Sequence, residues 1–213
     1  MRFTVSTIRA LLVLLLMAAP TPLIAADYTD KAALDELFAQ LKVAQTPQEA
    51  NDLTAQIWNI WFSPDVPALA ERMSKASVTM QAGDFPGALA QFTSIVTDYP
   101  DYAEGWNQRA TLYFVMGNLD ASLADIEKVL ALEPRHFGAL SGRVMIYLKQ
   151  GKRGDALKDM IAALAIDPYL DEKKLFPELS TARGGQPWIA FVRPRAMSKS
   201  PTAGISMAMR AKP

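Results

Sequence analysis

Apolar side chains recur every three or four residues in the first part of the chain, a spacing that predicts amphipathic helices. One such helix is predicted over residues 31–44, and a second over residues 47–62. Thr46 and Pro47 form a helix start signal, because threonine caps a helix N-terminus and proline is tolerated at the first helical position. We interpret residues 27–68 as a degenerate repeat that covers the end of a stack, since terminal repeats are usually atypical.

Glycine and proline recur along the middle of the chain at intervals of 34 residues. The residues that keep this period are Gly83, Gly117, Gly151, Pro100, Pro134 and Pro168. A period of this length is typical of a helix–turn–helix repeat that stacks on copies of itself. Each glycine is predicted to end the first helix of its unit in a left-handed conformation, and each proline to end the second helix. Asp101 and Glu104 predict a capping box at the start of the middle unit. The predicted units are residues 69–102, 103–136 and 137–170.

The pattern changes after the third unit. Residues 171–183 are predicted to form a capping helix, or two short turns, because Pro177 disfavours a long regular helix. Residues 184–213 combine glycine, proline and serine without a steady apolar period, which predicts a disordered basic tail. The one apolar run in this tail is PWIAFV at residues 187–192, and it could dock on the body of the protein.

Residues 1–26 have the parts of a secretory signal. Two arginines make the start basic, an apolar run follows over residues 10–19, and cleavage is expected after Ala25 or Ala26. The alternative is an uncleaved membrane anchor. A spanning helix needs about 20 apolar residues, however, and prolines interrupt this run early. We therefore expect a secreted or periplasmic protein.

The middle unit carries a characteristic order of large and small side chains. The order is aromatic, small, aromatic, small, large apolar and proline. The residues that follow it are Trp106, Ala110, Tyr113, Ser122, Ile126 and Pro134. This order resembles the tetratricopeptide repeat, and the two flanking units match it in part. The resemblance implies an all-α fold, a short right-handed α-solenoid of antiparallel helix pairs. It also implies that the first helices line a concave groove for partner peptides. The chain as a whole resembles small secreted repeat proteins of Gram-negative bacteria.

One face of the three predicted first helices supplies the candidate groove residues. They are Met73, Ser77, Met80, Asn107, Thr111, Phe114, Ser141, Met145 and Leu148. This face is apolar and rich in methionine, which favours adaptable contacts with a protein segment. Only Asn107 fits the carboxylate-holding chemistry of the family's best-known peptide site. Alternatively, the N-terminal helix pair or residues 187–192 fill the groove from within the same chain, because an exposed apolar patch needs cover.

Lys75, Arg109 and Arg143 occupy the same position in the three units. A ladder of positive charge would suit an acidic peptide. The interpretation that we favour is that their stems cover apolar surface while the charges stay in water.

Catalytic or metal-binding chemistry is not expected from this sequence. The chain has no cysteine and one histidine, His136, which we place in a loop between units. A single histidine cannot build a metal site without other ligands. Hydrolase, metalloprotease, phosphate-loop and calcium-loop patterns are absent from the sequence. We therefore expect no cofactor, no bound metal and no enzymatic activity.

The charges are distributed unevenly, although the formal net charge is zero. Residues 27–178 hold all 22 acidic residues and 14 of the 22 basic ones, whereas residues 179–213 hold six bases and no acid. The acidic body argues against nucleic acid binding, and the basic tail suits weak contact with an anionic membrane. We expect an exported interaction module for a protein or peptide partner. The alternative is a membrane-surface or envelope-complex subunit, held by an uncleaved signal or by the basic tail.

Overall fold

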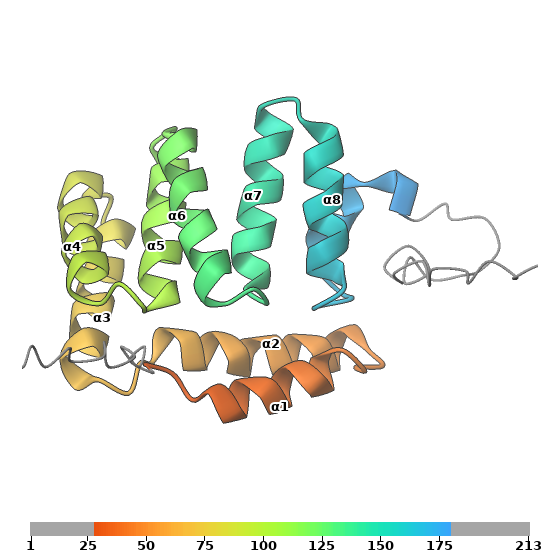
Figure 1. Ribbon diagram of the computed structural model, residues 1–213, viewed down its shortest axis with the longest axis horizontal. Coiled ribbons are helices and arrows are strands. Elements are labelled where there is room, and N and C mark those ends of the chain that lie inside the picture. The colour runs from red at the N-terminus through yellow and green to blue at the C-terminus, as the bar shows by residue number, and fades with distance from the viewer. Residues whose placement is uncertain (1–27, 180–213) are drawn as a thin grey trace, which may run out of the picture.

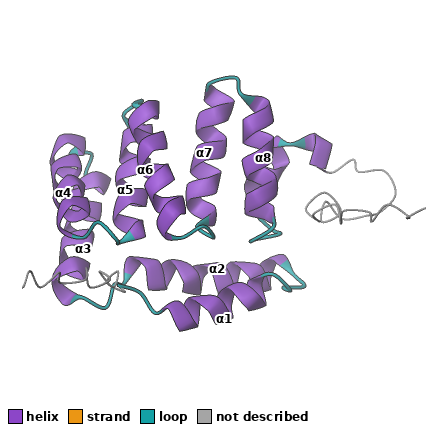
Figure 2. Cartoon of the chain, in the orientation of Figure 1, coloured by secondary structure: helices purple, strands orange, loops and turns teal. Residues whose placement is uncertain are grey.

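The computed structural model describes residues 28–179, and the regular secondary structure of this part of the chain is helical (Figures 1 and 2). The predicted all-α repeat fold is therefore confirmed. The α-helices are α1 Lys31–Leu41, α2 Pro47–Phe62, α3 Pro67–Gln81, α4 Phe85–Asp98, α5 Ala103–Val115, α6 Leu119–Leu132, α7 Phe137–Lys149 and α8 Arg153–Leu164. The predicted signal sequence, the residues after 179 and the basic tail lie outside the described residues.

Three antiparallel helix pairs, α3–α4, α5–α6 and α7–α8, stand side by side as a stack (Figure 1). The turn within each pair contains the periodic glycine, with φ of 82° at Gly83, 79° at Gly117 and 72° at Gly151. A side chain with a β-carbon rarely adopts this left-handed conformation, which explains why glycine recurs there. Asp84 and Asn118 then cap the second helices of the first two pairs through their side chains.

Small side chains allow the two helices of a pair to approach closely. Ala88, Ser122 and Ala156 occupy equivalent positions on the second helices, and all three are buried. The Ser122 hydroxyl also donates a hydrogen bond of 2.7 Å to the carbonyl oxygen of Ala110 on the facing helix. Such a bond satisfies a buried hydroxyl and pins the two helices together.

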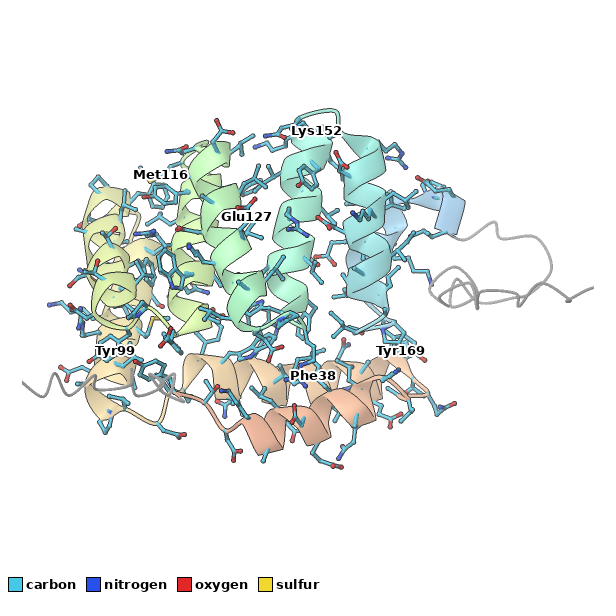
Figure 3. The ribbon with its side chains drawn as sticks, viewed as in Figure 1. Phe38, Tyr99, Met116, Glu127, Lys152 and Tyr169 are labelled. Atoms are coloured by element: carbon cyan, nitrogen blue, oxygen red, sulfur yellow. The ribbon has the colours of Figure 1, made fainter. Side chains whose placement is uncertain are left out.

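The N-terminal helix pair does not continue the stack, contrary to the expectation from sequence. Instead, α1 and α2 lie across the edge of the stack at which the loops between repeats are found (Figure 1). Phe38 and Tyr169 lie at this edge, whereas Met116 and Lys152 mark the opposite edge with the glycine turns (Figure 3). The physical reason is the apolar face of α1 and α2, which packs on Phe137 and on side chains that follow α8.

Two polar contacts fix this crosswise arrangement. Arg135, in the loop after α6, forms an ion pair of 2.6 Å with Asp35 on α1. The guanidinium of Arg135 also lies 4.4 Å from the centre of the Phe38 ring. Further along the same edge, the Tyr169 hydroxyl donates a hydrogen bond to the carbonyl oxygen of Ala44.

After α8 the described chain ends in two short 3-10 helices, η1 Asp171–Leu175 and η2 Pro177–Leu179. The structure therefore has two short turns where a single capping helix was the main expectation, because Pro177 cannot continue η1. Phe176 between them is fully buried against Met160 and Leu164 of α8, and it closes the last repeat.

The predicted capping box at the start of α5 is wrong. The N-cap residue is Tyr102, and no side chain caps this helix end. The Glu104 carboxylate turns inward to His136 and has an exposed fraction of only 1%. Within residues 28–179, none of the helices is long and apolar enough to cross a membrane.

Candidate protein-binding groove

The concave side of the stack contains two adjoining hollows. The first, which we call the N-terminal hollow, has a volume of about 570 Å³ and lies between α3 and α5. The second, the central hollow, has a volume of about 550 Å³ and lies between α2, α5 and α7. Phe62 of α2 and Gln108 of α5 line both hollows. The two hollows are therefore neighbours on one groove, with α2 along its lower edge.

The structure brings eight of the nine predicted groove residues to this surface. Met73, Ser77 and Met80 line the N-terminal hollow, and Asn107, Thr111, Ser141 and Met145 line the central hollow. Phe114 lines a smaller cleft of about 120 Å³ between α5 and α7, which it shares with Thr111 and Met145. Leu148 differs, because its side chain packs partly buried in the core of the last repeat. A binding role for these residues stays a prediction.

Exposed apolar side chains concentrate in the groove. Among the described residues, eight large hydrophobic side chains are exposed. Four of the eight line the two hollows, namely Phe62 (39% exposed), Val78 (62%), Val115 (51%) and Met145 (37%). Scattered single apolar residues on a surface need no explanation, whereas these four side chains gather in two adjoining hollows.

Sequence reasoning considered the N-terminal helix pair as a cover for the groove but named none of its residues as groove residues. Trp58 and Phe62 line the central hollow, although they precede the first repeat by several residues. Trp58 also rests on Gly138 of α7, where a β-carbon would lie only 2.5 Å from the indole ring. The aromatic composition of α2 was visible in the sequence, but its place under the repeats depends on contacts with residues far along the chain.

A buried polar network lies behind the groove. His136 is fully buried and stacks on the Trp61 ring, with 4.0 Å between the ring centres. Its Nδ1 accepts a hydrogen bond from the Ala139 N–H and thereby caps α7. Because Nδ1 accepts, the ring proton is on Nε2, which donates to Glu104 Oε2 at 3.0 Å. His136 is therefore a structural residue in the core, and the prediction that it lies in an ordinary loop missed this role.

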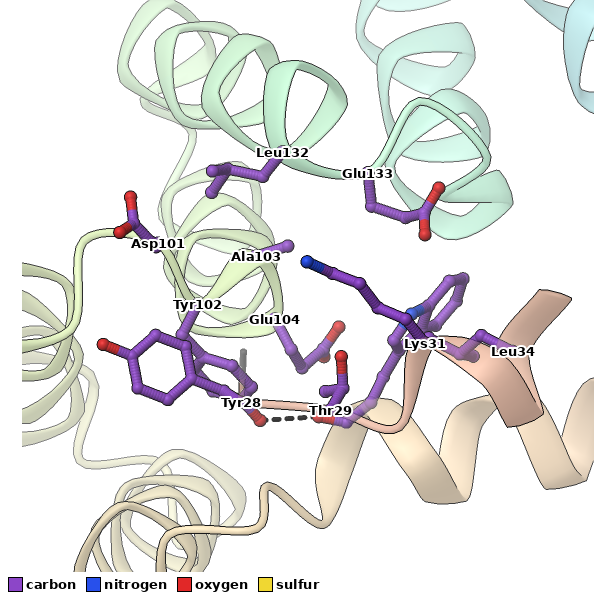
Figure 4. Close-up of a pocket in the computed structure, with 11 residues that line it drawn as sticks. Tyr28, Thr29, Lys31, Leu34, Asp101, Tyr102, Ala103, Glu104, Leu132 and Glu133 are labelled. Carbon is purple, nitrogen blue, oxygen red and sulfur yellow. Dashed lines mark hydrogen bonds between the residues drawn. The ribbon is translucent and has the colours of Figure 1, made fainter. Parts of the chain in front are cut away.

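Glu104 receives donors from its own helix as well. Asn107 Nδ2 donates to both carboxylate oxygens, at 3.1 and 3.2 Å, and Gln108 Nε2 donates to Oε1 at 2.6 Å. Figure 4 shows Glu104 extending from α5 toward the N-terminal segment that carries Thr29 and Lys31. Beside it, Tyr102 donates its hydroxyl to the backbone of Trp61, and burial raises the pKa of that hydroxyl.

This network fixes the orientation of two groove side chains. A carboxylate only accepts hydrogen bonds, so the amide nitrogens of Asn107 and Gln108 must face Glu104. Their carbonyl oxygens, Asn107 Oδ1 and Gln108 Oε1, receive no hydrogen bond from any described residue. Asn107 Nδ2 is thus engaged by Glu104, and a role for Asn107 in holding a peptide carboxylate stays a prediction.

The comparisons with known proteins agree with this architecture. No family model matches the chain. A TPR repeat-containing protein of Rhizobium etli is 35% identical over 99 residues, which cover 46% of this chain and 48% of that protein. The chain resembles tetratricopeptide repeat proteins. The match spans about half the length of this curated relative.

Two solved structures are similar to this chain, and both are crystal structures of MamA. One has a TM-score of 0.44 and 20% identity, over 67% of this chain and 80% of that chain. The other has a TM-score of 0.43 and 19% identity, over 68% and 79% respectively.

Two of the three basic residues in this column of the tetratricopeptide-like repeats form ion pairs within their own repeat. Arg109 binds Asp125 with distances of 2.7 and 2.8 Å, and Arg143 binds Asp159 with distances of 2.6 and 2.8 Å. Hydrogen bonding to these carboxylates raises the pKa of both guanidinium groups, although burial opposes the shift. The expectation that these two charges stay in water is therefore wrong, and they do not form a ladder for an acidic peptide.

The sequence contained a signal for these pairs. An aspartate stands 16 residues after the arginine in both repeats, and the first repeat has Gln91 at the equivalent position after Lys75. Gln91 binds Thr79 instead. Over residues 28–179, no group of three or more acidic or histidine side chains is placed to hold a metal ion.

Proposed function

We propose that this chain is a non-catalytic interaction module that binds an apolar, extended protein segment along the concave groove. The observation that carries this proposal is the run of four exposed apolar side chains, from Val78 and Val115 in the N-terminal hollow to Phe62 and Met145 in the central hollow. The one histidine is committed to capping α7 and to holding Glu104, which leaves it no part in acid–base chemistry.

The geometry sets a scale for the affinity. Full burial of an apolar side chain stabilises a complex by about 1.5–3 kcal/mol, and these four are already partly covered, so each contributes roughly 1 kcal/mol. Their sum corresponds to a dissociation constant in the millimolar range. A micromolar complex needs about 8 kcal/mol, so the segment that binds must bring apolar side chains of its own. We therefore expect an occupant with at least two large apolar anchors.

We also propose that the module acts outside the cytoplasm, in the periplasm or a comparable exported location. This part of the proposal rests on the pattern of residues 1–26, with its basic start, apolar run and small residues at the expected cleavage position. Sequencing the N-terminus of the mature protein tests it. A mature chain that starts at residue 26 or 27 supports export with cleavage, whereas retention of Met1 contradicts it.

The groove is tested by charge substitutions on its exposed side chains. Met145→Asp places a carboxylate in the central hollow, and Val115→Asp does so in the N-terminal hollow. Both side chains belong to the exposed ones, at 51% for Val115 and 37% for Met145, so the variants should stay folded, with thermal midpoints within a few degrees of the wild type. Phe114→Asp is a poorer choice, because Phe114 packs against the core of the middle repeat.

The readout is crosslinking in cells, followed by mass spectrometry of the captured partner. The matched control is Val43→Asp, since Val43 is 64% exposed and lines neither hollow. We expect Met145→Asp to lower the yield of the partner at least tenfold and Val43→Asp to leave it unchanged. Equal yields from all four proteins would show that partners bind elsewhere, as in a membrane-surface or structural subunit.

A further inference from the structure

We propose that the central hollow is occupied by residues 187–195 of this same chain, with the sequence PWIAFVRPR, and that a partner must displace this segment. The inference rests on the proposed function of the groove and names a regulation of that site. Four properties lead to this occupant: the hydrogen-bonding groups that the hollow offers, its apolar lining, the charge of the body, and the place where the described chain ends.

The hollow offers hydrogen-bond acceptors. His136 donates to Glu104, and the amide nitrogens of Asn107 and Gln108 face Glu104, so both amide oxygens remain open to donors from an occupant. Glu172 of η1 adds a carboxylate to the lining. Such a surface favours an occupant rich in N–H donors, and arginine carries five of them.

The lining also requires apolar anchors. Trp58, Phe62 and Met145 line the central hollow, and the last two are exposed. Residues 187–195 combine both requirements in one short stretch. Trp188, Ile189, Phe191 and Val192 supply apolar side chains, and Arg193 and Arg195 supply donors directly after them.

The overall charges are complementary. The body over residues 27–178 has eight more acidic than basic residues, whereas residues 179–213 carry six bases and no acid. Opposite charges on a body and its own tail raise the frequency of encounter and favour docking over release. The acidic body of a second copy, by contrast, would be repelled by the acidic body of the first.

The described chain ends against α8, where Glu178 pairs with Arg153, after it has passed the central hollow. Leu170 and Glu172 line the hollow, and the last described residue, Leu179, is seven residues beyond Glu172. Pro187 is eight residues beyond Leu179. An extended chain spans about 3.3 Å per residue. The eight residues from Leu179 to Pro187 can therefore span roughly 26 Å, whereas Leu179 lies at most roughly 23 Å from Glu172. Residues 187–195 can therefore always reach the mouth of the hollow.

The experiment measures binding of a fluorescent peptide with the sequence of residues 187–195 to full-length chains. The chains are the wild type, Trp188→Asp, and Ile205→Asp as a matched control in the tail outside the segment. A tether of this length gives an effective concentration on the order of millimolar, so a docked tail competes strongly with free peptide. We expect Trp188→Asp to bind the peptide at least tenfold more tightly than the wild type, and Ile205→Asp to match the wild type.

Two further measurements locate the binding and test its chemistry. Met145→Asp, introduced together with Trp188→Asp, should abolish peptide binding, since Met145 lines the hollow. A peptide with glutamate in place of both arginines should bind about tenfold more weakly, because it removes the donors. Unchanged affinity in the first measurement would place the peptide elsewhere and overturn the inference.

The outcomes separate this inference from the proposed function. Equal and measurable peptide affinity for the wild type and Trp188→Asp would show that the groove binds such segments while the tail does not dock. Absence of binding to both chains would overturn the choice of occupant, and the cell crosslinking with Met145→Asp would still decide the groove. A molecular mass that doubles with concentration in the wild type, but not in Trp188→Asp, would assign the segment to a second copy and refute docking within one chain.

Discussion

Glu104 is the residue whose substitution tests the buried network most directly. Its carboxylate accepts hydrogen bonds from three side chains, those of His136, Asn107 and Gln108. Glu104→Gln keeps the shape of the side chain but replaces one acceptor oxygen with a donor nitrogen. That nitrogen must then face either the His136 Nε2–H or the amide groups of α5. His136 cannot relieve the conflict by changing tautomer, because Nδ1 already accepts from the Ala139 N–H.

The expected loss of stability follows from the number of hydrogen bonds that Glu104 accepts and from their burial. Glu104 is 1% exposed and His136 is fully buried, so water cannot replace a lost partner. A hydrogen bond to a charged group contributes about 1.5–3 kcal/mol, and Glu104→Gln removes the charge and at least one bond. We expect a loss of about 2–4 kcal/mol in the free energy of unfolding.

Urea unfolding followed by circular dichroism measures this loss, with Glu71→Gln as the control. Glu71 is exposed on α3, so its substitution should change the free energy of unfolding by less than about 0.5 kcal/mol. A loss below 1 kcal/mol for Glu104→Gln would refute the assignment of Glu104 as the acceptor that organises the network. The orientation of the Asn107 and Gln108 amides would then lose its support as well.

Two other substitutions test the packing and the electrostatics of the fold. Gly138→Ala drives a β-carbon into the Trp58 indole and should destabilise the fold by about 1–3 kcal/mol in thermal unfolding. The control is Gly154→Ala, which lies at the same second position of its helix but faces open space. It should be neutral or stabilising. Equal effects would mean that α2 does not press on α7. Burial raises the pKa of Asp167 above 3.8 although the Tyr169 N–H opposes the shift, so the charged form is disfavoured in the folded state. The stability of the wild type relative to Asp167→Asn should therefore fall as the pH rises through and above the usual titration range of aspartate, and a rise measured in urea would contradict the assignment.

The features that sequence reasoning predicted well are local. The glycine turns follow from the steric freedom of glycine at positive φ, and the start of α2 follows from the Thr46 side chain, which accepts from the Glu49 N–H. Each of these features involves residues a few positions apart. The helix face that supplies the groove candidates follows from helical periodicity alone, which is why eight of the nine candidates reach the concave surface.

The features that were missed depend on contacts between distant residues. Glu104 had the right spacing from Asp101 for a capping box, but His136, 32 residues further on, is a better partner for a buried carboxylate. No local pattern ranks these two alternatives. The position of α1 and α2 was missed for the same reason, since their apolar faces suit either an added repeat or a crosswise helix pair, and only Phe137 and the residues after α8 decide between them.

The crosswise helix pair changes how this repeat protein should fold. In an open solenoid each unit contacts only its neighbours, so units can melt, fray or be added almost independently. Here Asp35 is paired with Arg135, 100 residues away, and the Tyr169 hydroxyl reaches the backbone of Ala44 across 125 residues. Such long chain closures slow folding but couple the first helices to the last repeat. The described part of the chain is therefore a closed cooperative unit of fixed length, in which a repeat cannot be inserted or deleted without leaving α1 and α2 poorly supported.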